Sequence, residues 1–451
     1  MISEASTFNS QQLLDSLARL PAPKKYWVGF SGGADSTALL QALHECRDQL
    51  VKPIHAVHFH HGLQGQADAW RDHCRAFCDA RDIPFLSEQL EIKQSGRSSP
   101  EEEARNSRYR AVANILGDRE MYLTAHHAED QAETLFLNLM RGSGIEGLAG
   151  IPVLRNLEKG WVARPLLDRY RPELERFLES RGIEWVTDPS NEDVTFDRNY
   201  LRQELFPLLE KRWPGLGRRL SRTARNARIS AGAMAMFIES QSGDLIRDRL
   251  KMPLQKLLEL DPEMQTLILR QWLRRHEVPV LPEARLREFL DQLGGSQLVN
   301  QAEVQWEDWM IKRYQRDLWL HRRDPFKACP EVVWKSGMKL DLGPETGVLR
   351  LVGDTTSIPG SWRVRGRQSG DRIRLLPHGP NQKLKQFFQS AFIPPWLRSG
   401  IPVLEWDGKP VALGDWVIGH RLQNWLFKHN LEYQWRPADP VLSRVRTDCQ
   451  R

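Results

Sequence analysis

The sequence lacks the features of membrane-spanning, exported and disulfide-rich proteins. Its 451 residues contain no apolar run near the roughly 18 residues that cross a bilayer, so we expect no transmembrane helix. Glu4 is present near the start and no basic residue precedes Arg19, so we expect no signal peptide. The few, scattered cysteines are Cys46, Cys74, Cys78, Cys329 and Cys449. They exclude a disulfide framework and indicate a reducing, cytoplasmic compartment.

Several common nucleotide-binding and repeat signatures are also missing. The chain has no Gly-x-x-x-x-Gly-Lys-Ser/Thr loop, no Gly-x-Gly-x-x-Gly fingerprint at its glycine-rich turn, and no repeat of fixed period. The hydrophobic fraction of 40% and charged fraction of 27% exclude an intrinsically disordered chain. A chain of this length is expected to form about three domains.

Positive charge is present and is unevenly distributed. The net charge is only +6, but residues 211–230 carry seven basic side chains and no acidic one. Residues 361–400 carry eight basic side chains and one acidic side chain. Such density indicates a phosphate-rich partner, although a solvated face explains either stretch equally well. Sixteen tryptophans are present; some could stack on bases, but most are expected to fill the core.

Hydrophobic patterning predicts the fold class of the first half. From Lys24 to about Asp197, short apolar runs alternate with helical stretches, which is typical of a parallel sheet with helices on both faces. We expect strands at 26–30, 53–59, 85–92 and 121–125, and helices at 35–50, 67–81, 100–116 and 128–140. The expected fold class is therefore α/β, a doubly wound parallel sheet, which binds ligands at the carboxyl ends of its strands.

The pattern changes near Trp213. From there to about Trp272 the chain is mostly helical, and from Leu340 onward short β-like runs are separated by Gly, Pro and Asp turns. We therefore expect three domains: the doubly wound domain at 1–212, a mainly helical domain at 213–335, and a small mixed α+β domain at 336–451.

The strongest motif is Phe30-Ser31-Gly32-Gly33-Ala34-Asp35-Ser36, between an expected strand and an expected helix. Two glycines permit a tight turn, and the N–H groups of the helix start with two serine hydroxyls form an anion cradle. A carboxylate beside phosphates usually holds Mg²⁺, so Asp35 is a candidate ligand for this ion. An ordinary Gly-Gly turn, with Asp35 favoured by the helix dipole, is an equally weighted interpretation.

The segment from Ser31 to Ser36 resembles the SGGxDS pyrophosphate loop of the N-type ATP pyrophosphatases, or PP-loop superfamily. Members adenylate an oxygen of their substrate, release pyrophosphate and let a nucleophile displace AMP. The resemblance implies the cofactors ATP and Mg²⁺, ATP binding by residues 31–36, and Asp35 as the metal ligand. The loop alone does not distinguish synthetases of NAD, GMP or asparagine from tRNA-modifying enzymes.

A second block, His126-His127-Ala128-Glu129-Asp130-Gln131-Ala132-Glu133-Thr134, follows an expected strand. It resembles the H-x-x-D-D-Q-x-E-T block of the tRNA(Ile)-lysidine synthases, with Glu129 where that family usually has Asp. Asp130 and Glu133 are one helical turn apart, so we expect them to share a face and hold Mg²⁺ or an ammonium group. A polar helix start is the simpler interpretation; zinc is disfavoured because no Cys or third His stands at ligand spacing.

Further blocks match the same family in order. They are Val57–Leu63, Glu102–Tyr109, Arg141–Leu148, Arg164–Leu166, Asp188–Asn191, Arg198–Asn199, Lys383–Arg398 and Ile401–Leu404. Arg105 and Arg108, one turn apart, could clamp phosphate or base, or simply pair with Glu101 and Glu102 on their own helix. The resemblance is dense over residues 24–220 and clear again over 366–413.

The resemblance implies an enzyme that attaches lysine to C2 of the wobble cytidine in the CAU anticodon of tRNA(Ile), through an adenylated cytidine. That change would convert codon reading and amino-acid identity from methionine to isoleucine. The implied partners are this tRNA and free lysine, with no membrane, and the chain acting as a monomer or homodimer. The implied catalytic residues are Asp35, Arg105, Arg108, His126, Asp130 and Glu133. The implied tRNA contacts are Arg218, Arg222, Arg225, Arg363, Arg365, Arg367, Lys383, Lys385 and Arg398.

Two alternatives stay open. A tRNA-thiolating enzyme of the same superfamily would need a cysteine pair to carry sulfur, and only Cys74 and Cys78 lie close together, within an expected helix and without a Cys-x-x-Cys motif. The basic stretches would also suit a non-catalytic RNA-binding protein, although the intact loop and the Asp130/Glu133 pair argue against a degenerate site.

Overall fold

The computed structural model describes residues 8–60, 67–90, 100–187, 193–294, 302–322, 328–335, 339–353, 358–438, 442–443 and 446–447. The chain divides between Ala235 and Met236 into two compact units. The motif at Asp188–Asn191 and the last three residues of Val57–Leu63 lie outside the described residues. No helix in the described ranges is long and apolar enough to cross a membrane.

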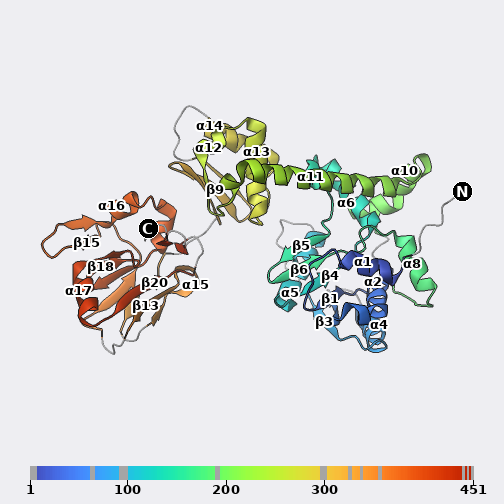
Figure 1. Ribbon diagram of the computed structural model, residues 1–451, viewed down its shortest axis with the longest axis horizontal. Coiled ribbons are helices and arrows are strands. Elements are labelled where there is room, and N and C mark those ends of the chain that lie inside the picture. Colours follow the sequence, from blue (N-terminus) through green and yellow to red (C-terminus); the bar gives the residue numbers. More distant parts are fainter. Residues whose placement is uncertain are drawn as a thin grey trace. The chain divides into compact units, whose positions relative to one another are not determined.

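Six strands of the first unit form one sheet in the order β3-β2-β1-β4-β6-β5 (Figure 1). They are β1 (Tyr26–Gly29), β2 (Ile54–His60), β3 (Phe85–Gln89), β4 (Met121–Leu123), β5 (Leu154–Leu157) and β6 (Gly160–Ala163). All pairs are parallel except β5 with β6, an antiparallel hairpin. Because β2 and β4 flank β1, the strand order reverses at β1, and such a switch point is where parallel sheets bind ligands.

Helices cover both faces of this sheet. They are α1 (Ser10–Leu17), α2 (Ala34–Glu45), α3 (Arg47–Leu50), α4 (Ala67–Asp79), α5 (Pro100–Ile115), α6 (Ala128–Met140), α7 (Ile145–Leu148) and α8 (Arg171–Glu179). Apolar residues of α1, α2, α4 and α8 pack with Val28 and Leu123 on one face. On the other face, Val112 and Leu116 at the end of α5 pack with Tyr122. The doubly wound fold expected from the sequence is confirmed.

The expected elements match closely, with two differences. The helix expected at 35–50 is broken, because Cys46 leaves the helical conformation (φ −105°, ψ 14°), so α2 ends at Glu45 and α3 begins at Arg47. The β5–β6 hairpin was not foreseen. Its strands have four residues each, and its turn contains Glu158 at φ +48°, a conformation usually signalled by Gly or Asn.

Glu45 links three helices of the first unit. Its carboxylate accepts hydrogen bonds from Ser10 of α1 (2.5 Å), Gln41 of α2 (2.9 Å) and Arg181 just after α8 (2.5 and 3.0 Å). Burial by itself raises the pKa of Glu45, but the bonds from Arg181, Gln41 and Ser10 lower it from 4.5 to about 2.

This depressed pKa predicts an acid-dependent loss of stability. Because the folded-state pKa lies below the unfolded one, the contribution is complete above about pH 4.5 and disappears as the pH falls towards 2. We expect Glu45→Gln to lower the melting temperature by roughly 2–4 °C at pH 7, and the difference from wild type to shrink below pH 4.5. Thermal unfolding at pH 7, 5, 4 and 3 measures this. A constant difference, or one as small as that of the exposed control Asp48→Asn, would contradict it.

The first unit ends in a helical segment made of α9 (Asp197–Tyr200), a π-helical turn η2 (Leu201–Leu205), α10 (Phe206–Arg212) and the start of α11 (Leu216–Ile246). In the second unit, α12 (Leu254–Leu258), α13 (Pro262–Arg275) and α14 (Glu283–Gly294) accompany the sheet β7-β10-β9-β8. Its strands are β7 (Lys251–Pro253), β8 (Glu303–Trp306), β9 (Trp309–Tyr314) and β10 (Asp317–Arg322). The mostly helical stretch expected after Trp213 is confirmed.

The C-terminal part of the second unit is rich in antiparallel strands. One sheet contains β11 (Val332–Trp334), β14 (Trp362–Arg365), β17 (Val403–Trp406), β18 (Lys409–Leu413) and β19 (Val417–Ile418). A second contains β12 (Lys339–Asp341), β13 (Val348–Val352) and β20 (Glu432–Arg436), and β15 (Arg372–Arg374) pairs with β16 (Asn381–Lys383). The helices are α15 (Gly343–Thr346), α16 (Leu384–Ser390), the 3₁₀ segment η3 (Pro395–Gly400) and α17 (His420–Lys428).

Tryptophan rings fill the core of this C-terminal part. Trp362 is fully buried, and its ring lies 5.6 Å from that of Trp334, 5.7 Å from Trp406 and 5.1 Å from Trp425. These rings fill a core, as most of the tryptophans were expected to do. The division into three domains stays a prediction.

Candidate active site

The loop between β1 and α2 has the geometry of an anion cradle. Gly32 has φ +84°, and a Cβ there would lie 3.0 Å from the Cys74 sulfur, so only glycine fits without strain. The Ser31 and Ser36 hydroxyl oxygens are 3.1 Å apart, and no side chain caps the start of α2. The first N–H groups of α2 therefore remain available to an anion.

A cavity of 410 Å³ opens in front of this loop, at the carboxyl ends of β1, β2 and β4. Ser31, Gly33, Asp35 and Ser36 line it on the loop side, and the other side is lined by Arg108 of α5, His126 just before α6 and Asp130 of α6. The structure therefore brings together these seven of the residues predicted from the sequence, at the switch point of the sheet.

His127, which begins α6, is surrounded by carboxylates. Its Nδ1 is 2.9 Å from Glu129, and its Nε2 is 3.5 Å from both Asp35 and Asp130. Its backbone N–H also donates to Asp130 at 2.8 Å. Burial alone would lower the pKa of His127, but the charge of Asp130 and the contacts with Asp35 and Glu129 raise it well above its ordinary value. A buried imidazolium thus holds the three acids together.

The neighbouring groups have shifted pKa values for identifiable reasons. Burial lowers the pKa of His126 to about 4, so this imidazole is neutral at pH 7. Burial opposes ionisation of Asp130, but His127, His126 and the His127 N–H hold its pKa below the ordinary range. Burial raises the pKa of Glu133. The charge of Arg202 opposes that rise, and the charge of Asp130 adds to it. Strong shifts of this kind are concentrated at functional sites.

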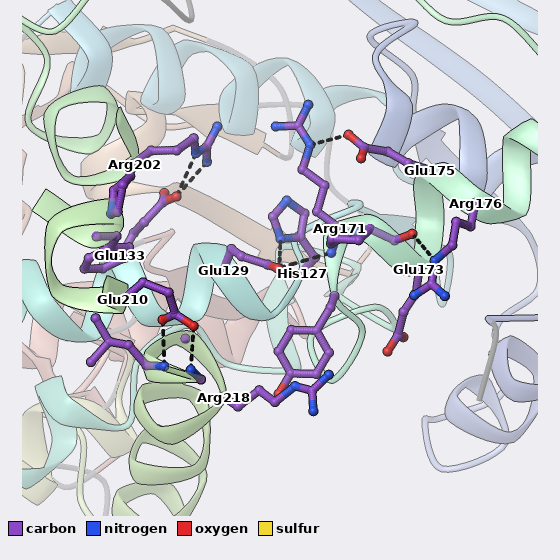
Figure 2. Close-up of a pocket in the computed structure, with 17 residues that line it drawn as sticks. His127, Glu129, Glu133, Arg171, Glu173, Glu175, Arg176, Arg202, Glu210 and Arg218 are labelled. Atoms are coloured by element: carbon purple, nitrogen blue, oxygen red, sulfur yellow. Dashed lines mark hydrogen bonds and ion pairs between the residues drawn. The ribbon is translucent and has the colours of Figure 1, made fainter. Parts of the chain in front are cut away.

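Glu133 does not point into the 410 Å³ cavity with Asp130. It lines a second cavity of 540 Å³ between α6, α8, α10 and the start of α11. Figure 2 shows Arg202 reaching its carboxylate from the π-helical turn, at 2.7 Å, and the same guanidinium lies 3.6 Å from Asp130. The expectation that Asp130 and Glu133 together hold a cation is therefore modified, because Arg202 already bridges them.

The expected metal ligand has an unpaired carboxylate oxygen. Asp35 Oδ1 is buried and has no hydrogen-bond partner among the described residues, while Oδ2 faces His127. An orphaned carboxylate oxygen beside an anion cradle is the donor that Mg²⁺ bridging to phosphates prefers. Within the described ranges, no group of three His, Cys, Asp or Glu side chains forms a separate metal site. The residues present fit the expected Mg²⁺, with Asp35 as its ligand.

The two arginines of α5 are placed differently from one another. Arg108 lines the 410 Å³ cavity, whereas Arg105 is exposed one turn earlier and lies 5.8 Å from the ring of Tyr109. On α11, Arg218, Arg222 and Arg225 are exposed and line a third cavity of 430 Å³. The predicted helical face is thus formed, with Arg218 over the ring of Tyr170 at 5.2 Å.

The basic residues of the C-terminal part fall into two groups. Lys383, Lys385 and Arg363 are exposed, and Arg363 pairs with Glu331 at 2.8 Å. Arg367 lies over the ring of Phe388 at 5.6 Å.

Arg365 and Arg398 are engaged inside the protein. Arg365 is buried and binds Asp371 at 2.8 Å and Glu405 at 2.6 Å. Arg398 donates to the Ile393 carbonyl oxygen at 2.7 and 2.9 Å. Because these donors are occupied, the expectation that the two residues contact tRNA is not carried further.

Sequence reasoning missed two residues of the site. His127 was quoted in its motif but given no role, although it contacts three carboxylates. Arg202 lies 69 positions from Glu133, and no local spacing indicates that they pair. One signal could have indicated such a partner. A glutamate on the core side of a helix is buried, and a buried carboxylate needs a cation from elsewhere in the chain.

Comparisons with known proteins agree with this geometry. Residues 5–209 match a PP-loop domain family, residues 252–319 a TilS substrate binding domain, and residues 362–435 a TilS substrate C-terminal domain. The chain is 34% identical over 433 residues to the tRNA(Ile)-lysidine synthase of Xanthomonas axonopodis pv. citri, covering 93% of this chain and 96% of that protein. It is 37% identical over 417 residues to that of Alkalilimnicola ehrlichii, covering 90% and 92%.

Proposed function

Because this chain belongs to the tRNA(Ile)-lysidine synthase family, we propose that it ligates free L-lysine to C2 of the wobble cytidine in the CAU anticodon of tRNA(Ile). The chain is a tRNA-modifying ligase with a PP-loop ATP-binding domain. The observation that carries the proposal is the single cavity in which the loop, Asp35, His126 and Asp130 meet. ATP would be converted to AMP and pyrophosphate.

The first step activates the base. The C2 oxygen of cytidine is a poor leaving group, and its adenylation makes it a good one. Ser31, Ser36 and the free N–H groups of α2 are placed to stabilise the departing pyrophosphate. Asp35 would hold Mg²⁺, which neutralises charge on the phosphates when it is bound.

The second step delivers lysine. A free lysine amine has a pKa of about 10.4 and is protonated at neutral pH, so the site must attract an ammonium group and then remove a proton. Asp130, ionised and facing the cavity, supplies the attraction. His126 is neutral, and its Nδ1 contacts the Thr124 hydroxyl at 2.7 Å, which leaves Nε2 for the base or the adenylate. Attack of the amine on C2 then releases AMP.

The RNA must present its base to this cavity. A wobble base belongs to a single-stranded loop and can leave its stack at small energetic cost. Arg108 lines the cavity and would contact phosphate or base there, and Arg105, one turn earlier on α5, is a second candidate for such a contact. Lysine at C2 would change the hydrogen-bonding edge of the base, and with it codon reading and identity from methionine to isoleucine.

Thiolation is the competing chemistry within the superfamily. Cys74 and Cys78 are both fully buried in α4, and burial raises the pKa of each thiol to about 12. A buried thiol with a raised pKa is a poor sulfur carrier, because the thiolate is the reactive form. The intact cavity likewise favours an enzyme over a non-catalytic RNA-binding protein.

The order of the two steps can be tested directly. Purified protein with ATP, Mg²⁺ and tRNA(Ile) but no lysine should release one equivalent of pyrophosphate, and addition of lysine should release AMP and permit turnover. Pyrophosphate release that requires lysine but not tRNA would contradict an adenylated cytidine and indicate activation of the amino acid instead.

The basic face of α11 predicts a salt dependence of tRNA binding. Each phosphate contact contributes about 0.7 to 0.9 to the slope of log K against log salt concentration. Replacing Arg218, Arg222 and Arg225 with Ala should therefore reduce the slope by about 2 or more, measured by fluorescence anisotropy from 50 to 300 mM salt. An unchanged slope would move the contact surface to Arg363, Arg367 and the neighbouring lysines.

A further inference from the structure

The mechanism above gives no role to Tyr109, Arg155 or Arg164. Together with Arg105 they form a group that we call the Tyr109 cluster. Arg155 of β5 stacks on the Tyr109 ring at 4.4 Å, and Arg105 approaches the same ring at 5.8 Å. Arg164, directly after β6, donates to the Tyr109 hydroxyl at 2.9 Å. Three cations from three elements thus converge on one aromatic side chain.

The cluster has no carboxylate to balance it in the part of the chain that the structure describes. Arg164 is 2% exposed, yet it donates only to the Pro152 carbonyl oxygen and the Tyr109 hydroxyl, and its Nε has no partner. A buried guanidinium is normally paired with an acid, because leaving it unpaired costs free energy. Among the described residues, therefore, no acid balances the buried charge of Arg164.

The chemistry of the stack favours a phosphate as that anion. The guanidinium carbon of Arg155 lies 4.4 Å from the centre of the Tyr109 ring, and no N–H donor of Arg155 is bonded to another described residue. An arginine that lies over an aromatic ring can still use its N–H donors for another partner. In-plane donors of arginine match two phosphate oxygens at once. Burial alone would raise the pKa of Tyr109, but Arg164 and Arg105 lower it, which reports the same positive potential.

The position of the cluster identifies which phosphate it suits. Arg155 pairs in register with Val162, near the carboxyl end of β6, and Arg164 follows that strand. Tyr122, which lines the 410 Å³ cavity, is packed in the same apolar cluster as Tyr109. The group therefore lies next to the cavity but on the β6 side, whereas the anion cradle for ATP follows β1. Arg155 is exposed, as a contact with a large ligand requires.

We propose that the Tyr109 cluster is a subsite for an RNA backbone phosphate, placed to hold the nucleotide next to the base that enters the cavity. This rests on the proposed function, in which RNA is the substrate. ATP is the other source of phosphate, and it would use the same donors.

Arg155→Gln and Arg155→Lys test the proposal. Arg47→Gln is the matched control, since Arg47 is an exposed arginine of the same unit in α3, before β2, whereas Arg155 lies on the edge strand β5. Arg155→Gln should weaken tRNA(Ile) binding about fivefold and reduce the salt slope by about 0.7, the contribution of one single-strand phosphate. Arg155→Lys should keep the slope, because the charge remains. The KM for ATP should stay within twofold, and unchanged melting temperatures would confirm intact folding.

Two results would overturn the proposal. Wild-type tRNA affinity and slope in Arg155→Gln would remove the phosphate contact altogether. A raised KM for ATP with unchanged tRNA binding would assign the cluster to the nucleotide. The test measures tRNA binding and not lysine transfer. A protein that binds tRNA but transfers no lysine would still show the slope change, so failure of the proposed function and failure of this proposal can be told apart.

Discussion

Replacing Asp35 with Asn is expected to reduce pyrophosphate release by at least about 10²-fold, while tRNA affinity changes less than twofold. Asp35 faces the cavity with one buried, unpartnered oxygen and contacts His127 with the other. An amide keeps the size of the side chain but loses the charge that holds Mg²⁺ beside the leaving group. Loss of one well-placed electrostatic group at a developing charge typically costs 10²–10³ in rate.

The test compares single-turnover pyrophosphate release and tRNA binding in the same preparations. Asp48→Asn serves as the control, because Asp48 is fully exposed and its helix α3 lies away from the loop. Wild-type pyrophosphate release by Asp35→Asn would remove this residue from the mechanism. A parallel loss of tRNA binding would instead indicate that the substitution disturbs the fold of the site.

The second large effect concerns stability. Glu133 is 1% exposed and depends on Arg202 at 2.7 Å, which is itself about two-thirds buried. Removing one partner of a buried ion pair typically costs 3–5 kcal/mol, because the remaining charge is left unpaired. Since Arg202 keeps some contact with solvent, we expect Arg202→Met to lower the free energy of unfolding of the first unit by about 3 kcal/mol.

A double-mutant cycle makes this prediction specific. Glu133→Gln together with Arg202→Met should recover at least half of the loss, because the unpaired carboxylate is then absent. Lys24→Met, which breaks an exposed ion pair with Asp118, should lower stability far less than Arg202→Met, because solvent screens exposed charges. Urea unfolding measures the free energy of unfolding of each variant. Equal losses in the Arg202 and Lys24 variants would contradict a larger contribution of the buried pair.

Local spacing was sufficient to predict the parts of the site that are local. The loop at Ser31–Ser36 and the helix start at His126–Asp130 each follow a strand directly, and parallel strands that flank one another bring their carboxyl ends together. The helix expected at 128–140 has the observed bounds of α6. These predictions succeed because the residues that determine each element, its periodic apolar positions and its turn residues, lie close together in the sequence.

Long-range pairing was not accessible to the same reasoning. The family resemblance implied that Arg365 contacts tRNA, but Arg365 is bound by Glu405, 40 positions away, and by Asp371. Helical spacing also placed Asp130 and Glu133 on one face, yet the packing of the π-helical turn against α6 gives each its own cavity. Only the three-dimensional structure reveals which cation meets which carboxylate.

The most direct test of the account is transfer of labelled lysine. Purified protein is incubated with ATP, Mg²⁺, labelled lysine and unmodified tRNA(Ile) bearing CAU, and the tRNA is then treated with mild alkali, which removes aminoacyl esters. We expect alkali-stable label at the wobble cytidine, and none in a tRNA whose wobble base is replaced by uridine. Absence of stable label while pyrophosphate is still released would contradict lysine as the nucleophile and leave an ATP pyrophosphatase with a different second substrate.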